Sequence, residues 1–158
     1  MRLSRRMGLL GGSGGPLWLF DGENGGDVTK NTGGWTGVGT SGSGGSSSYD
    51  ENEIRISVSR STSSDKSAAA QTVNYINFDK LTTLYFHVSS YAAPNDRRMG
   101  VLQSGSVSSY VASVAPTGTG WYSVDVSSVT GSYQVGFHVK ANKNGTSGRL
   151  YVDKVYAE

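Results

Sequence analysis

Two histidines and a few scattered acids are the residues of this chain whose types could support acid–base chemistry. His87 and His138 each occupy a polar position in a run of alternating polar and apolar residues, the pattern of a half-buried strand. If these strands share a sheet, both rings and Tyr85 could form a shallow polar platform; the simpler interpretation is two solvent-facing strand residues. No carboxylate stands near either histidine in sequence to orient it as a general base. We therefore expect a protein that is not an enzyme.

Aromatic residues in glycine- and serine-rich surroundings are a second group of candidates. Trp35, Tyr49 and Tyr91 lie in such stretches, where a large ring has little core to enter. Exposed flat rings beside polar loops suit sugar stacking or a protein contact. For Trp35 the alternative is a ring that closes one end of the core. Trp18 and Trp121 open strand-like runs, and we expect both in the core.

The first 16 residues differ in composition from the rest. They combine three arginines, a short apolar run and a glycine-rich tract, with no acidic residue. Such a segment cannot bury enough apolar surface to offset the entropy of ordering its glycines. We expect an extended arm whose arginines pair with acidic or carbonyl groups of a partner protein while its apolar side chains fill a groove. The predicted docking residues are Arg2, Arg5, Arg6, Met7, Leu9 and Leu10.

Charge and composition exclude several classes. The chain has 14 basic and 12 acidic residues, and three of the basic ones lie in the arm, so residues 7–158 carry 11 basic against 12 acidic groups. Nucleic-acid binding needs a clustered basic face, so we expect no nucleic-acid partner. No apolar run approaches the length of a membrane span. The absence of cysteine excludes disulfides and thiolate metal sites.

Short β-branched and aromatic runs separated by glycine and serine predict an all-β protein. Residues 54–58, 84–88, 122–126 and 133–139 alternate with a period of two, and 73–78 predicts a further strand. Residues 99–103 and 110–114 predict a hairpin, whereas 36–48 predicts a loop or a surface covered by neighbours. The fold class that follows is an antiparallel β-sandwich (jelly roll) over 17–158, with an extended N-terminal arm over 1–16.

Two stretches carry a resemblance to a known family. Residues 121–139, followed by Leu150-Tyr-Val-Asp-Lys-Val-Tyr, resemble the last strands of carbohydrate-binding-module jelly rolls. Leu19-Phe-Asp-Gly-Glu, followed by Gly33-Gly-Trp, is similar to their first strand and the loop after it. A short basic arm ahead of such a domain resembles small structural proteins of tailed bacteriophages. The likeness covers roughly two thirds of the chain, and its motifs are loose.

In several such modules, acids of the first and last strands hold a structural calcium. The resemblance implies that Glu23 and Asp153, with Asp27, occupy the matching positions. Calcium takes six to eight oxygen ligands, which three carboxylates and backbone carbonyls could supply together. The alternative is that all three are ordinary surface acids.

The leading hypothesis from the sequence is therefore a bacteriophage virion structural protein, located on the extracellular particle. It would be a capsid decoration, a tail component or a host-surface adhesin, docked on other virion proteins by its arm and repeated as a homo-oligomer. A host-surface glycan would bind at Trp35, Tyr49, Tyr91, Tyr85, His87 and His138. The alternative hypothesis is a free carbohydrate-binding module whose arm is incidental.

Overall fold

The computed structural model describes residues 15–24, 27–41, 45–59 and 64–158. Strands dominate this part of the chain, and no helix in it is long and apolar enough to cross a membrane. The elements in chain order are β1 (Leu17–Asp21), the 3-10 turn η1 (Gly22–Asn24), β2 (Trp35–Ser41), β3 (Gly45–Tyr49), β4 (Ile54–Val58), β5 (Lys66–Thr72), β6 (Ile76–Asn77), β7 (Thr83–Ala92), β8 (Asp96–Leu102), β9 (Tyr110–Val114), β10 (Gly120–Asp125), β11 (Ser132–Tyr133), β12 (Val135–Ala141) and β13 (Gly148–Ala157).

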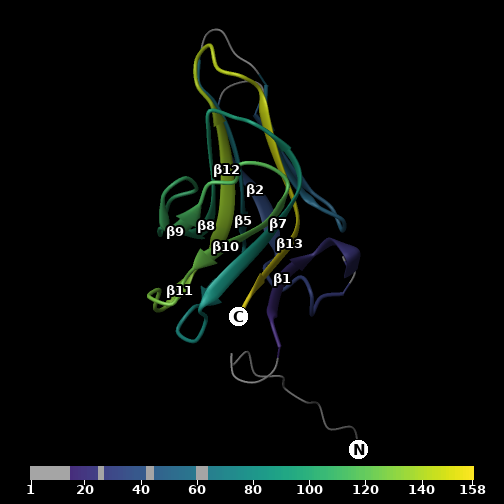
Figure 1. Ribbon diagram of the computed structural model, residues 1–158, viewed down its shortest axis with the longest axis vertical. Coiled ribbons are helices and arrows are strands. Elements are labelled where there is room, and N and C mark those ends of the chain that lie inside the picture. The colour runs from purple at the N-terminus through teal and green to yellow at the C-terminus, as the bar shows by residue number, and fades with distance from the viewer. Residues whose placement is uncertain (1–14, 25–26, 42–44, 60–63) are drawn as a thin grey trace, which may run out of the picture.

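The strands form two antiparallel sheets that face each other (Figure 1). The β13 sheet has the order β10-β7-β13-β4-β3, with β1 also paired to β13. The β12 sheet has the order β2-β5-β12-β8-β9, and β6 and β11 form a small separate pair. Successive strands repeatedly cross from one sheet to the other, as in a jelly roll. The predicted antiparallel sandwich is confirmed.

The core lies between the two sheets and comes from the apolar half of each alternating strand. The alternating pattern of these strands predicts an inward face made of their apolar residues, and those residues are buried, namely Phe86, Val88, Val124, Val135, Phe137, Val139 and Val152. Tyr122 packs against this cluster from its edge. The period-two pattern therefore gave the correct inward face for the central strands.

Trp35 belongs to this core, which corrects its prediction as an exposed sugar-stacking ring. Only 3% of the residue is exposed, and its ring lies 5.7 Å from that of Phe137. Its indole N–H donates a hydrogen bond to the carbonyl of Leu19 (3.1 Å). The glycines and serines near Trp35 in sequence do not leave it exposed, because β2 pairs with β5 at the sandwich wall. The alternative interpretation of Trp35 as a core ring is the correct one.

Three further segments differ from the sequence prediction. The 36–48 tract contains most of β2 and β3, and both strands lie at sheet edges. Within 73–78 only β6 is extended, and the longer strand β5 precedes it with an alanine-rich sequence of low β propensity. By contrast, the hairpin predicted from 99–103 and 110–114 is present as β8 and β9.

Replacing the buried indole tests how Trp35 holds β1 against the β12 sheet. Trp35→Phe keeps a ring beside Phe137 and removes the donor to Leu19. The Leu19 carbonyl keeps the Gly33 N–H as a second donor (3.1 Å). The variant therefore loses one hydrogen bond, worth about 0.5–1.5 kcal/mol, and we expect the free energy of unfolding in urea to fall by that amount. Tyr75→Phe, which removes one hydroxyl from a 61% exposed tyrosine, is expected to change it by less than about 0.5 kcal/mol. Equal values for the two variants would contradict this account.

Candidate functional site

Five rings form a continuous aromatic strip on the outer face of the β13 sheet. The strip consists of Trp18, Tyr85, His87, Trp121 and Tyr156, from β1, β7, β10 and β13. Each ring contacts the next. The centroids are 5.0 Å apart for Trp18–Tyr156, 4.7 Å for Tyr85–Tyr156, 5.7 Å for Trp121–Tyr156 and 4.8 Å for His87–Trp121.

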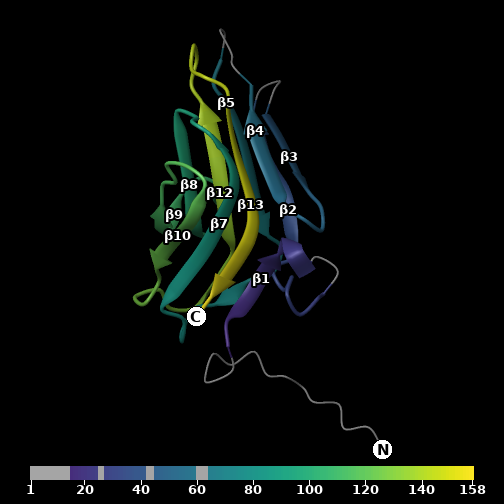
Figure 2. The same ribbon diagram turned by 45° about the vertical axis from the view of Figure 1, so that its right-hand side comes forward.

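Strand register explains why these rings meet. Tyr156 lies opposite Trp18 on one side and opposite Tyr85 on the other, while His87 lies opposite Trp121. Residues directly opposite each other on antiparallel strands share a face of the sheet. The strip therefore crosses four neighbouring strands, with β13 between β7 and β1 (Figure 2).

A β-bulge at Asp153 brings Tyr156 to this face. In the pairing of β7 with β13, Val152 is opposite Val88 and Lys154 is opposite His87, so Asp153 has no opposite residue. Leu150 and Val152 are buried before this bulge, whereas Val155 and Ala157 are buried after it. The residues of β13 that face the core therefore have even numbers before Asp153 and odd numbers after it. A strand of unbroken alternation would have turned Tyr156 toward the core.

Fixed polar groups adjoin the strip. His87 Nδ1 lies 2.6 Å from Asp153 Oδ1, and the Tyr85 hydroxyl donates to Glu158 Oε1 (2.9 Å). The bond to Glu158 raises the pKa of the Tyr85 phenol. At the other end of the strip, Lys30 Nζ stands 5.2 Å from the Trp18 ring centroid. These contacts hold the ring orientations and leave carboxylate oxygens at the edge of an apolar surface.

Exposure singles out Trp121 within the strip. It is 52% exposed, whereas the other four residues are half-buried. The sequence prediction that Trp18 and Trp121 lie in the core is therefore wrong for both. Each is the second residue of its strand, but its side chain faces outward. Period-two alternation alone does not fix which set of alternate residues faces the core. The flat indole of Trp121 offers a stacking surface to a ring with an apolar face.

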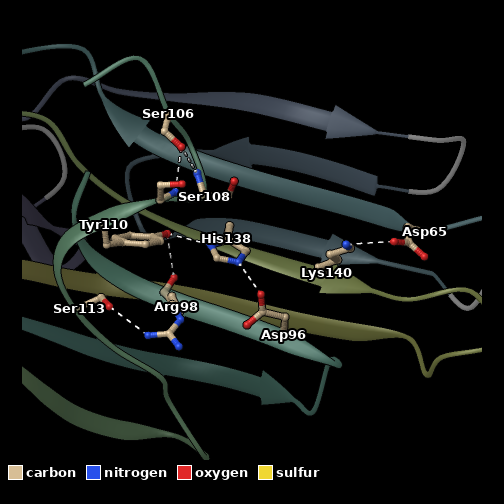
Figure 3. A network of polar contacts seen from close by, with 10 residues as sticks. Asp65, Asp96, Arg98, Ser106, Ser108, Tyr110, Ser113, His138 and Lys140 are labelled. Atoms are coloured by element: carbon tan, nitrogen blue, oxygen red, sulfur yellow. Dashed lines mark hydrogen bonds and ion pairs between the residues drawn. The ribbon is translucent and has the colours of Figure 1, made fainter. Parts of the chain in front are cut away.

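His138 lies on the outer face of the opposite sheet, so the predicted platform shared by both histidines is wrong. It stands on β12 beneath the β8–β9 loop and is only 4% exposed. This burial also contradicts the simpler prediction of a solvent-facing His138. Tyr110 stacks on its ring at 5.6 Å, and the Tyr110 hydroxyl lies 2.9 Å from His138 Nδ1 (Figure 3). On the other side, His138 Nε2 is 3.4 Å from Asp96 Oδ2.

The protonation of this network follows from burial. Burial lowers the pKa of His138, and the neighbouring Asp96 only partly opposes this effect. Burial also raises the pKa of the Tyr110 phenol. At neutral pH the imidazole is uncharged, and it lies between Asp96 and the Tyr110 hydroxyl, which also donates to the carbonyl of Arg98 (3.2 Å).

The remaining predicted aromatic residues lie apart from the strip. Tyr49, at the end of edge strand β3, is 57% exposed. Tyr91 is half-buried and packs against the core from the inner side of β7, opposite Leu150. Of the six predicted glycan-binding residues, only Tyr85 and His87 belong to the strip. Trp18, Trp121 and Tyr156 are surface residues that the sequence pattern did not indicate.

The three acids of the predicted calcium site each have a different partner. Glu23 pairs with Lys154 (2.9 Å), and Asp153 pairs with His87. Asp27 Oδ1 accepts from the backbone and hydroxyl of Thr29. Within residues 15–24, 27–41, 45–59 and 64–158, no group of three or more acidic or histidine side chains is placed to hold a metal ion. Calcium stays a prediction from the resemblance.

The predicted docking residues cannot be placed. Arg2, Arg5, Arg6, Met7, Leu9 and Leu10 all lie outside the described residues. The hypothesis of docking to other virion proteins therefore stays a prediction from sequence.

Comparison with known proteins gives a match among solved structures. No family model matches the sequence, and no curated protein matches it. Among solved structures, the chain is similar to CBM86, a low-affinity xylan-binding module from the xylanolytic gut symbiont Roseburia intestinalis. The two share 15% sequence identity with a TM-score of 0.48, over 78% of this chain and 94% of that chain. A carbohydrate-binding module is thus a structural neighbour, and the comparison offers no link to a bacteriophage.

The buried imidazole makes a pH-dependent prediction. Because burial depresses the pKa of His138 below its ordinary value of 6.5, the unfolded chain takes up this proton more readily than the native protein. We therefore expect the free energy of unfolding to decrease as the pH falls from about 7 to about 5. Urea unfolding across this range should show a shallower slope for His138→Gln, and NMR should show His138 titrating below 6.5. Titration above that value would contradict the assignment.

Proposed function

We propose that the protein binds carbohydrate, and that the aromatic strip is its binding surface. The observation that carries this proposal is the exposed indole of Trp121 at one end of an ordered row of rings. Pyranose rings have apolar C–H faces that stack on flat aromatic side chains and hydroxyl rims that need hydrogen-bonding partners. The strip and its adjoining Asp153 and Glu158 carboxylates provide both kinds of surface.

The size of the strip favours a saccharide chain over a single sugar. It crosses four strands, and neighbouring strands lie about 4.8 Å apart, so it extends over about 14 Å. A chain laid across the strands would stack one ring on Trp121 and pass over Tyr156 toward Trp18. The half-buried rings are already packed on one another, so they lose little side-chain entropy on binding.

The polar setting supports carbohydrate over a protein partner. Protein interfaces have apolar cores depleted of charged residues. Here the carboxylates of Asp153 and Glu158 adjoin the rings, and the Lys30 ammonium lies over Trp18. Charged groups mixed with aromatic rings in this way suit a ligand that is itself covered in hydroxyl groups. This proposal corresponds to the free carbohydrate-binding module, the second of the two hypotheses drawn from sequence.

A single substitution tests the strip. Trp121→Ala removes the exposed stacking surface, and we expect it to weaken binding of the preferred polysaccharide at least about tenfold, since buried aromatic anchors dominate such contacts. Affinity electrophoresis against a panel of soluble polysaccharides identifies the ligand, and isothermal titration calorimetry measures the change in Kd.

Tyr75→Ala is the matched control, because Tyr75 is comparably exposed and lies between β5 and β6, outside the β13 sheet. Binding by Tyr75→Ala should equal that of the parent protein. Equal losses in the two variants, or no binding by the parent protein to any polysaccharide of the panel, would overturn the proposal. Capture of a protein on the strip with no polysaccharide bound would also overturn it.

A further inference from the structure

A hollow lies on the outer face of the β12 sheet, on the far side of the sandwich from the aromatic strip. We call it the His138 pocket; it has a volume of about 460 Å³, within the range of small-molecule sites. Its walls come from β5, β8, β12 and the β8–β9 loop (Figure 3). The lining residues used below are Asp65, Ala69, Asp96, Ser108, His138 and Lys140.

Local sequence creates the hollow. Ala69 on β5 lies directly opposite His138 on β12, so a methyl group stands beside an imidazole on the outer face of the sheet. Above them the β8–β9 loop contributes Ser108 to the wall. The loop holds its shape because the Ser106 hydroxyl accepts the backbone N–H groups of Ser108 (3.2 Å) and Ser109 (2.8 Å). The depth of the pocket thus follows from a small residue on the floor and a braced loop at the side.

The charges of the lining select against an anionic ligand. Lys140 Nζ is paired with Asp65 Oδ2 at 2.9 Å, so its charge is already compensated. Asp96 has only the long 3.4 Å contact to His138 Nε2, and its side chain is 53% exposed. His138 is uncharged at neutral pH because burial lowers its pKa. The pocket therefore carries the net negative charge of Asp96, which repels phosphate, sulfate and carboxylate groups.

The donors and acceptors match a polyol. The Asp96 carboxylate can accept two hydroxyl groups at once, and charge-assisted bonds of this kind are the stronger ones. Lys140 retains further ammonium N–H donors, and the Ser108 hydroxyl can donate or accept. A metal cation is a poorer match, because within the described parts of the chain no three acidic or histidine groups gather to ligate one.

We propose that the His138 pocket is a second carbohydrate site, which takes one or two neutral sugar rings through hydrogen bonds to Asp96, Lys140 and Ser108. It differs from the aromatic strip in its recognition chemistry, because hydroxyl groups rather than a stacked ring face carry the binding. It also lies on the opposite sheet, so binding at either site can be tested independently of binding at the other.

Asp96 is the binding residue in this proposal, and His138 is a positioning residue. His138 Nε2 lies 3.4 Å from Asp96 Oδ2, and the Tyr110 hydroxyl lies 2.9 Å from Nδ1 on the other side of the imidazole. The groups packed around His138 that carry charge are Asp96, Arg98 and Lys140. Protonation of His138 would bring a cation beneath the pocket and tighten its pairing with Asp96, so sugar binding should weaken in acid.

The experiment is an NMR titration of the full chain with single sugars and disaccharides at millimolar concentration. The panel comprises glucose, galactose, mannose, xylose, N-acetylglucosamine, cellobiose, maltose and lactose. We expect saturable shifts of the Ala69 and Ser108 amides and of the His138 imidazole with at least one of them. Asp96→Ala should raise the Kd at least about tenfold, because it removes a charge-assisted bond. Trp121→Ala should leave this Kd unchanged.

Two further variants make the outcome unambiguous. Glu51→Gln removes an exposed acid elsewhere and should not affect binding. Ala69→Leu fills the floor of the pocket and should abolish the shifts, with unfolding in urea checking that the sandwich is intact. No saturable shift at the pocket with any sugar of the panel would overturn the proposal. Chemical-shift changes confined to the aromatic strip would overturn it as well, and so would shifts at the pocket that persist in both Asp96→Ala and Ala69→Leu. Loss of sugar binding at the aromatic strip alone would not contradict it.

Discussion

The β-bulge at Asp153 is the constraint on which the outer face of the β13 sheet depends. β13 is paired on both sides, with β7 along one edge and with β4 and then β1 along the other. A strand fixed in this way cannot rotate about its axis, so its side chains change face only where the ladder is interrupted. One unpaired residue therefore decides that Tyr156 lies among the outer rings while Val155 and Ala157 continue the core.

A compensating irregularity in β7 lets the two strands stay paired. Tyr151 is opposite Ser90 and Val152 is opposite Val88, so Ser89 is passed over on β7 just before Asp153 is passed over on β13. The side chains of both residues point outward, and each makes a contact with a polar side chain. Ser89 donates to Glu53 Oε2 (2.8 Å), and Asp153 contacts His87 (2.6 Å). The phase change thus also supplies the polar groups that orient the rings, because the residues left out of the ladder are the ones available to the surface.

The sequence predicted the sandwich well because its central strands alternate cleanly and alternation follows directly from burial on one face. It failed where long-range pairing decides the answer. Trp35 and Trp121 exchange their expected places. The register of β2 on β5 turns Trp35 inward, and that of β10 on β7 turns Trp121 outward. Neither register is visible in local sequence.

Tyr156 was missed because a bulge leaves no signature in a run such as Leu150-Tyr-Val-Asp-Lys-Val-Tyr beyond its two adjacent charged residues. Those charges, at Asp153 and Lys154, were the one available signal, since an unbroken strand would have turned one of them inward.

His138 shows the same limit from the other direction. Its strand alternates and its outward phase was assigned correctly, yet the residue is buried because the β8–β9 loop lies over that face. Alternation identifies the face of a sheet, but it cannot tell whether a loop covers that face.

The two outer faces of the sandwich differ in character: one presents rings across four strands, and the other presents a walled polar hollow. Packed sheets lie about 10 Å apart, and the surfaces point away from each other. One straight saccharide chain therefore cannot occupy both sites. The gain in affinity that arises when a single ligand binds two sites at once does not apply here. Two sites arranged in this way would instead join separate chains through one small, rigid domain.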